Sequence, residues 1–124
     1  MTPKYIIETT DPRGLYVRCS EKQWNEHIIR EPEGHPIMKE KEYIVSKTVT
    51  DPDFIYEDKN NPGSRNVYIK DDNDNIYPGT NKCTKVVAQI GGGYADIITA
   101  YPTNKNRKQY EGSELYARED TSEL

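Results

Sequence analysis

The sequence predicts an α+β domain in which two N-terminal helices pack on one face of a small, twisted antiparallel sheet. Apolar residues recur with a helical period up to about residue 50, and they alternate with a period of two over residues 53–101. The length of 124 residues also suits one domain with a single core. We expect residues 1–103 to form this domain and residues 104–124 to be a polar, flexible tail.

The composition is that of an acidic protein with a modest core. The net charge is −4 and the hydrophobic fraction is 33%, while ten tyrosines and one tryptophan supply large rings for burial. A protein that relies on phosphate contacts alone is usually basic, so the acidity counts against a passive nucleic-acid binder. A nuclease with a local basic cluster is still compatible with this charge.

The sequence contains no motif of a membrane segment, a leader or a metal site. No apolar run reaches the length of a membrane span or of the apolar part of a signal peptide. The two cysteines, Cys19 and Cys83, form no CxxC pair, and we expect two reduced, buried thiols. These features predict a cytoplasmic protein with no membrane contact, no metal and no cofactor.

Two short strands and a helix are expected at the start of the chain. Residues 4–9 and 14–19 have the composition of strands, and a turn with a proline and a glycine joins them. Ser20 and Gln23 have the spacing of a capping box, which predicts a helix that begins there and ends near residue 30.

The helical half of the chain has two apolar faces. Trp24 and Ile28 are four residues apart and share a helix face, so we expect Trp24 in the core. After a break at proline and glycine, a second helix is predicted over residues 36–48. Its apolar stripe consists of Ile37, Ile44, Val45 and Thr48.

The second half of the sequence has the alternating pattern of strands. The last predicted strand carries Thr99 and Tyr101, which are two residues apart and therefore share one face. Ile98 and Ala100 are then expected on the other face, against the helices. The predicted strands are residues 54–56, 65–70, 82–90 and 96–101.

Two histidines and a polar strand pair supply groups that RNA cleavage without a metal requires. One group must accept the 2′-hydroxyl proton, another must protonate the leaving 5′-oxygen, and cations must hold the phosphate. His27 and His35 are the two histidines of the sequence, and Arg30 lies one turn after His27. Thr99 and Tyr101 offer hydroxyls on one strand face. Each of these residues is also ordinary on a protein surface, so spacing alone leaves the site undecided.

An ordered set of short motifs resembles a known family. The most specific motifs are Trp24-x-x-His27 with His35-Pro36, and the run Ile98-Thr99-Ala100-Tyr101-Pro102-Thr103. Between them lie Val49-x-Asp51-Pro52-Asp53-x-Ile55, Asn66-x-Tyr68 with Lys70, and Lys85-Val86-Val87. In this order, residues 20–103 resemble the phage-associated members of the barnase–EndoU–colicin–RelE-like superfamily of metal-independent nucleases.

The resemblance implies helices on one face of a twisted antiparallel sheet and an endoribonuclease that needs no metal. Its substrate would be RNA, such as tRNA, and cleavage would be a transesterification. A toxin-like or phage–host role is also implied, with an antitoxin or inhibitor protein as a second partner. The matching positions are His27, Thr99 and Tyr101 for catalysis, and His35, Lys70 and Arg65 for substrate binding.

The chain departs from the family pattern just before the second histidine. The family usually has Arg-His-Pro-Glu, whereas this sequence has Gly34-His35-Pro36-Ile37. The arginine beside the histidine is therefore missing, and we expect Arg30 from the preceding turn to replace it in the catalytic set.

Two other functions are compatible with the sequence. The first is a catalytically inert relative that binds a protein or RNA partner, as an inhibitor or regulatory module, and the net charge of −4 favours it. The second is an unrelated phage or plasmid structural protein. Toxicity on expression separates the nuclease from both, because an inactive protein should tolerate overexpression.

Overall fold

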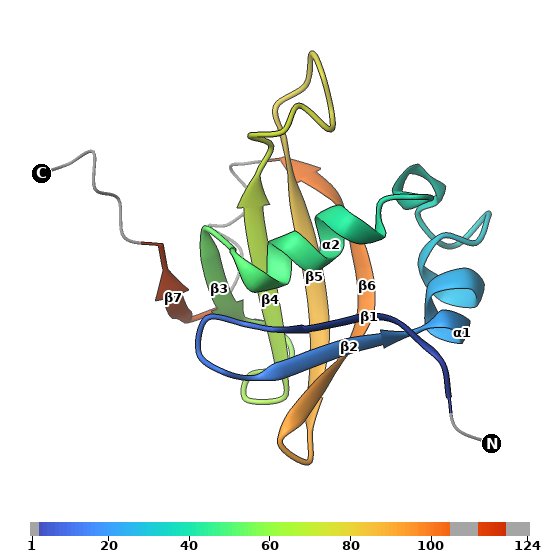
Figure 1. The fold of residues 1–124 in the computed structure, drawn as a ribbon. Helices are drawn as coiled ribbons and strands as arrows, with labels where there is room; N and C mark the ends of the chain where they lie inside the picture. Colours follow the sequence, from blue (N-terminus) through green and yellow to red (C-terminus); the bar gives the residue numbers. More distant parts are fainter. Residues whose placement is uncertain (1–2, 105–111, 119–124) are drawn as a thin grey trace, which may run out of the picture.

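The computed structural model describes residues 3–104 and 112–118, and Figure 1 shows their arrangement. Its main element is a seven-stranded mixed sheet with the order β1-β2-β6-β5-β4-β3-β7. β2 and β6 run parallel, and the other neighbouring strands are antiparallel. The strands are β1 (Tyr5–Thr10), β2 (Tyr16–Ser20), β3 (Phe54–Glu57), β4 (Arg65–Asp71), β5 (Lys82–Gly91), β6 (Tyr94–Asn104) and β7 (Glu114–Ala117).

The predicted fold, two N-terminal helices on one face of a small antiparallel sheet, is wrong. The N-terminal hairpin of β1 and β2 joins the same sheet through the parallel pairing of β2 with β6. The helical segments are short, and the sheet is the larger part of the molecule. Periodicity identifies a strand but not its partner. The sequence pattern therefore predicted a sheet made of residues 53–101 alone, whereas the N-terminal hairpin adds two more strands to it.

Both predicted helices are shorter than expected. The helical segments are α1 (Glu21–Gln23), the π-helix η1 (Trp24–Ile28), the 3-10 helix η2 (Pro36–Met38) and α2 (Glu42–Thr50). The second predicted helix is interrupted around Glu40, whose φ of 65° lies in the left-handed region. Ile37 is consequently 52% exposed, whereas Ile44, Val45 and Thr48 of the predicted stripe are buried.

The first helix begins as predicted and ends in a π-turn. The amide of Gln23 donates to Ser20 Oγ at 3.0 Å, which is one half of the predicted capping box. The Gln23 side chain instead donates to the carbonyl of Ile98 on β6, at 2.8 Å. The amide of Ile29 then donates to Trp24 O at 3.1 Å, the five-residue spacing of a π-helix.

The main core lies between α2 and the curved sheet. α2 crosses β4 and β5, and β1 passes beside it (Figure 1). Trp24 belongs to this core and is 2% exposed, so the prediction for Trp24 is confirmed. Because side chains alternate along a strand, a second cluster lies on the opposite side of the sheet, which we call the far face. Its buried members are Tyr56, Val67, Ile69, Cys83 and Val87.

A buried carboxylate holds the turn between β1 and β2 against the centre of the sheet. Asp11 Oδ2 accepts from the hydroxyl of Tyr68 on β4 at 2.7 Å and from Arg13 Nη2 at 3.1 Å. Asp11 Oδ1 accepts from the amides of Arg13 and Leu15 at 2.8 and 3.1 Å. Burial, together with the hydrogen bond to Asp11, raises the pKa of Tyr68. Both oxygens of the buried carboxylate are thus paired, which such a group requires.

Part of the predicted C-terminal tail is a strand. β7 pairs with β3 at the edge of the sheet, and Arg118, next to β7, forms ion pairs with Asp51 and Asp53. This segment of the tail is therefore attached to the domain. The remaining residues of the predicted tail, 105–111 and 119–124, lie outside the described residues.

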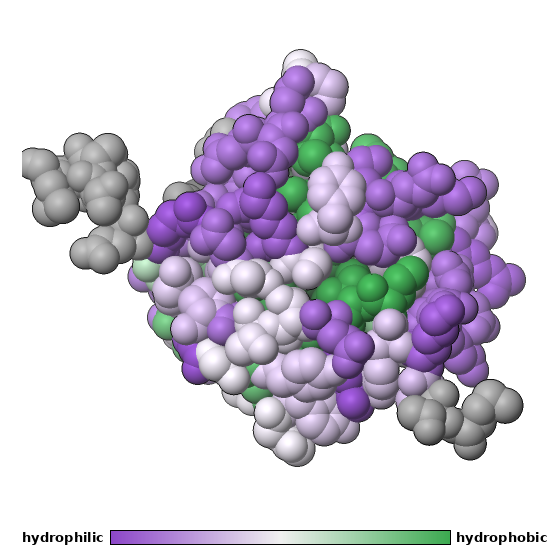
Figure 2. Space-filling view, in the orientation of Figure 1, coloured by the Kyte–Doolittle hydropathy of each residue, from purple (hydrophilic) through white to green (hydrophobic). Residues whose placement is uncertain are grey.

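The surface that carries α2 is mainly hydrophilic. Figure 2 shows hydrophilic residues over most of this side, with a hydrophobic area between α2 and β1. Among the described residues, the exposed large hydrophobic side chains are Ile37, Tyr43 and Leu115. Within residues 3–104 and 112–118, none of the helices has the length and apolar character needed to cross a membrane.

Replacing Trp24 with alanine should lower the free energy of unfolding by about 3–5 kcal/mol, because a large buried ring is lost. Urea denaturation followed by circular dichroism measures the change. Asn25→Ala alters the neighbouring exposed residue and should stay within about 0.5 kcal/mol of the wild type. Equal unfolding midpoints for the two variants would contradict the core position of Trp24.

Candidate functional site

β2 pairs with β6 only along the first residues of β6. The paired residues are Tyr16 with Tyr94, Val17 with Ala95 and Arg18 with Asp96. Beyond Asp96, β6 is contacted by η1 and η2, which lie beside it in Figure 1. We call residues 97–104 the outer half of β6. Helical segments take the place of a neighbouring strand here. Side chains from these segments can therefore contact the side chains of the outer half of β6.

A β-bulge turns the side chains of β6 at the start of its outer half. Ala88 pairs with Ile97 and Val87 pairs with Thr99, which leaves Ile98 as an extra residue. Ile98 therefore packs against the far-face cluster, and the prediction that it faces the helices is wrong. Ala100 does lie in the main core as predicted.

Thr99 and Tyr101 share the far face of the sheet, as the sequence predicts. They pair with Val87 and Lys85, which are themselves two residues apart on β5. Val87 belongs to the far-face cluster, so both hydroxyl-bearing residues point away from α2. The two side chains are partly exposed.

His35 reaches the far face and stacks on Tyr101. The two ring centroids are 4.6 Å apart and the planes are inclined by 27°. Lys85 Nζ lies 5.6 Å from the centroid of the same tyrosine ring, within range of a cation–π contact. Partial burial lowers the pKa of His35, so its imidazole is neutral near pH 7. An imidazole, a phenol and an ammonium group are therefore neighbours, and a neutral imidazole can accept a proton.

Glycine at position 34 allows His35 to take this position. The amides of Gly34 and His35 donate to Arg30 O and Ile28 O at 2.7 and 2.6 Å, closing the end of the first helix. A Cβ on Gly34 would lie 2.6 Å from Arg30 O and 2.7 Å from both His27 O and Ile28 O. The arginine that the family pattern places here does not fit without a backbone shift.

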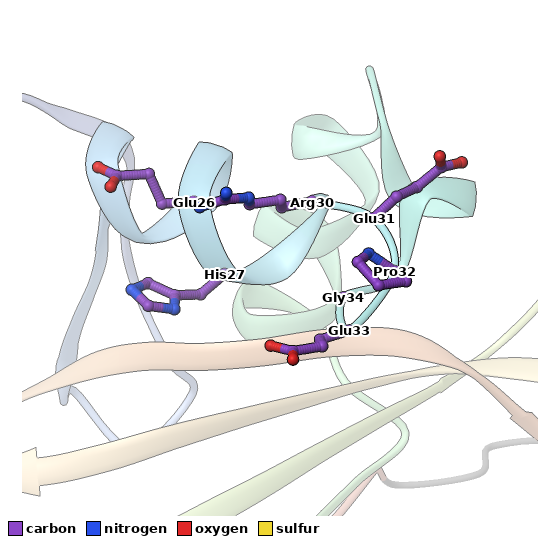
Figure 3. Close-up of a pocket in the computed structure, with 7 residues that line it drawn as sticks. All are labelled: Glu26, His27, Arg30, Glu31, Pro32, Glu33 and Gly34. Carbon is purple, nitrogen blue, oxygen red and sulfur yellow. The ribbon is translucent and has the colours of Figure 1, made fainter.

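His27 and Arg30 line a pocket between η1 and the loop that follows it. The pocket has a volume of about 390 Å³. Figure 3 shows the side chains that line it. Three glutamates lie in the lining beside one arginine and one histidine, so carboxylates dominate its charge. The lining residues are Glu26, His27, Arg30, Glu31, Pro32, Glu33 and Gly34.

The two predicted strand cations occupy different faces of β4. Lys70 Nζ donates to the carbonyl of Asp51 at 2.9 Å, and its side chain is 4% exposed. Lys70 thus caps the C-terminal end of α2, where a positive charge is favourable. Arg65 lies on the other face and donates from Nε to Gln89 Oε1 at 2.9 Å.

The structure thus places the predicted site residues in separate groups. His35, Thr99 and Tyr101 lie at the far face, whereas His27 and Arg30 line a pocket that includes neither Thr99 nor Tyr101. Sequence reasoning missed Lys85 as a site residue. Its alternation with Val87 shows a shared strand face, but its position opposite Tyr101 depends on strand pairing.

Comparisons of the chain with protein-family models, with curated proteins and with solved structures found no match. Among the described residues, no three histidine, cysteine, aspartate or glutamate side chains gather in a group that could hold a metal ion. The geometry at the outer half of β6 is therefore the basis for assigning a function.

Gly34→Ala should destabilise the protein by about 1–3 kcal/mol, because its methyl group would overlap three carbonyl oxygens. Gly91→Ala is the matched control, since a Cβ there meets open space and the backbone has no positive φ. Urea denaturation of both variants tests this difference. A Gly34→Ala protein as stable as Gly91→Ala would show that the loop does not depend on glycine.

The imidazole of His35 should titrate below pH 6.5, because desolvation disfavours its charged form. A pH titration of the imidazole proton signals, followed by proton NMR, gives the midpoint of the His35 titration. Tyr101→Leu removes the stacked ring and should move the midpoint up toward the ordinary histidine value. Tyr43→Leu, an exposed tyrosine on α2, should leave it unchanged. A wild-type midpoint at or above 6.5 would contradict this account.

Proposed function

We propose that this chain is a metal-independent endoribonuclease whose site lies at the outer half of β6. The observation that carries the proposal is the stack of His35 on Tyr101 with the Lys85 ammonium beside the same ring. Proton transfer, base stacking and phosphate neutralisation each need one of these groups. Thr99, on the same strand face, adds a hydroxyl that can donate to a phosphate oxygen.

The proposed reaction is transesterification that leaves a 2′,3′-cyclic phosphate. The neutral imidazole of His35 suits removal of the 2′-hydroxyl proton. His27 lines the neighbouring pocket and would protonate the leaving 5′-oxygen of an RNA that extends from the strand face into that pocket. Lys85 would hold the phosphate beside Tyr101, Arg30 would contact the RNA in the pocket of His27, and Tyr101 would orient the RNA.

A role for the protein as a toxin or in phage–host conflict belongs to the same proposal. RNA would be the substrate, with tRNA as the first candidate, and an antitoxin or inhibitor protein would be the second partner. Cytoplasmic location follows from this role. Induced expression of the wild type should then arrest growth, whereas a site variant should be tolerated.

A specific observation favours the inert module as the alternative function. Three glutamates, Glu26, Glu31 and Glu33, surround His27 and Arg30 in the pocket of Figure 3. Carboxylates repel a phosphate but attract a lysine or arginine side chain of a protein partner. In this alternative the pocket binds a basic segment of that partner, and no RNA is cleaved.

Cleavage of tRNA in the presence of EDTA tests the nuclease proposal. Wild-type protein should cleave at the same rate with and without the chelator and should release 2′,3′-cyclic ends. His35→Ala and His27→Ala should each lose a factor of about 10²–10⁴ in rate, because a proton-transfer group is removed. Tyr43→Phe alters an exposed residue of α2, on the opposite face of the sheet from Tyr101, and should retain the wild-type rate as the control.

Two results would overturn the nuclease proposal. The first is cleavage that stops in EDTA, which would require a metal-dependent reaction. The second is an unreactive wild type whose overexpression is tolerated, which would support the inert module. Loss of cleavage in only one histidine variant would exclude the other histidine from proton transfer.

A further inference from the structure

Arg18 on β2 is held between two aromatic rings. Its guanidinium carbon lies 4.5 Å from the ring centroid of Tyr5 on β1 and 4.2 Å from that of Tyr94 on β6. Both rings are within the range of a cation–π contact with the guanidinium. The N–H groups of a guanidinium point outward in its own plane, so its hydrogen bonds form there.

In that plane, Asp96 occupies one edge of the guanidinium. Arg18 Nε donates to Asp96 Oδ1 at 2.9 Å, which fixes the rotation of the group. Within the part of the chain that the structure describes, Asp96 is its only hydrogen-bond partner, and the side chain is 24% exposed. The Nη groups form a planar fork that matches a phosphate group.

Arg18 lines a second pocket, which we call the Arg18 pocket. Its volume is about 320 Å³, and it forms where β2 leaves β6 and continues into α1. Ser20 and Gln23 add polar groups to its lining. The pocket lies beside β6 at Asp96, and Tyr101 is five residues further along the same strand, a distance of about 17 Å.

We propose that the Arg18 pocket binds a backbone phosphate of a single-stranded RNA whose cleaved phosphate lies at the outer half of β6. The identity of the ligand rests on the proposed function, but the contact itself requires no cleavage. The separation along β6 corresponds to a few nucleotides of an extended strand. Asp96 neutralises part of the charge of Arg18, so the pocket serves one phosphate of a longer strand rather than free phosphate.

The direct test uses wild-type protein and an RNA that cannot be cleaved. The probe is a single-stranded hexanucleotide with 2′-O-methyl sugars, which lack the attacking hydroxyl. In nitrogen–proton NMR spectra, the Arg18 Nε–Hε signal and the amide of Asp96 should shift with saturation as the probe is added. Inorganic phosphate at the same concentrations should produce no saturating shift.

Variants give a second, independent readout. Arg18→Gln should weaken probe binding and reduce the slope of log K against log salt by about 0.7, because one phosphate contact of a single strand is lost. Arg18→Lys should keep the slope but bind more weakly, since it lacks the planar fork. Arg118→Gln is the matched control, because it removes an ion-paired arginine beside β7 at the opposite edge of the sheet.

The outcomes separate this inference from the nuclease proposal. A response at Arg18 without cleavage of natural RNA would support the pocket and overturn the nuclease. Cleavage of RNA with no response at Arg18 would overturn only the pocket. Saturation by inorganic phosphate with the affinity of the probe would overturn the assignment to an RNA strand. If Arg18→Gln does not fold, the wild-type spectra and the Arg18→Lys variant test whether the Arg18 pocket binds the probe.

Discussion

The end of the pairing between β2 and β6 at Asp96 is the constraint on which the rest of this structure depends. A strand whose neighbour departs must find other partners for its backbone groups. The carbonyl of Ile98 finds one in the side-chain amide of Gln23, at the start of the helical region. The first helical segment is thereby fixed against β6, and both histidines follow it in the chain. The Arg18 pocket and the His35–Tyr101 stack lie on either side of this junction.

The short helices are related to the same constraint, because residues 21–41 contact β6 where β2 no longer pairs with it and add Trp24, Ile28 and Met38 to the main core. A long straight helix would run past β6, whereas a π-turn and a tight return keep the chain beside it. The return requires Gly34, whose amide closes the helix end without a side chain in the way. His35 then leaves the loop directly over Tyr101. The position of the imidazole is thus determined by backbone hydrogen bonds of the residues before it.

Local sequence patterns predicted the local features of this chain. The predictions that are wrong concern features that depend on pairing between distant strands. The buried stripe of α2, the cap at Ser20 and the burial of Trp24 each depend on neighbours within a few residues, and the sequence predicts them. The parallel partner of β2 has no such signal, so the hairpin was not assigned to the sheet. Lys70 illustrates the same limit within the candidate site. Its alternation with Tyr68 shows which residues share a face, but only the register across β5 and β6 shows that Thr99 lies on the other one.

The acidity of the protein bears on how the proposed site would hold RNA. Several cations of the described residues are already paired with carboxylates, as Arg13 is with Asp11 and Arg18 is with Asp96. Such pairs orient the cation while they reduce its net attraction for phosphate. Binding of RNA at the proposed site would then combine these paired cations with stacking of bases against rings such as Tyr101. It follows that an acidic protein of this design would favour unpaired nucleotides, whose bases are free to stack, over the regular backbone of a duplex.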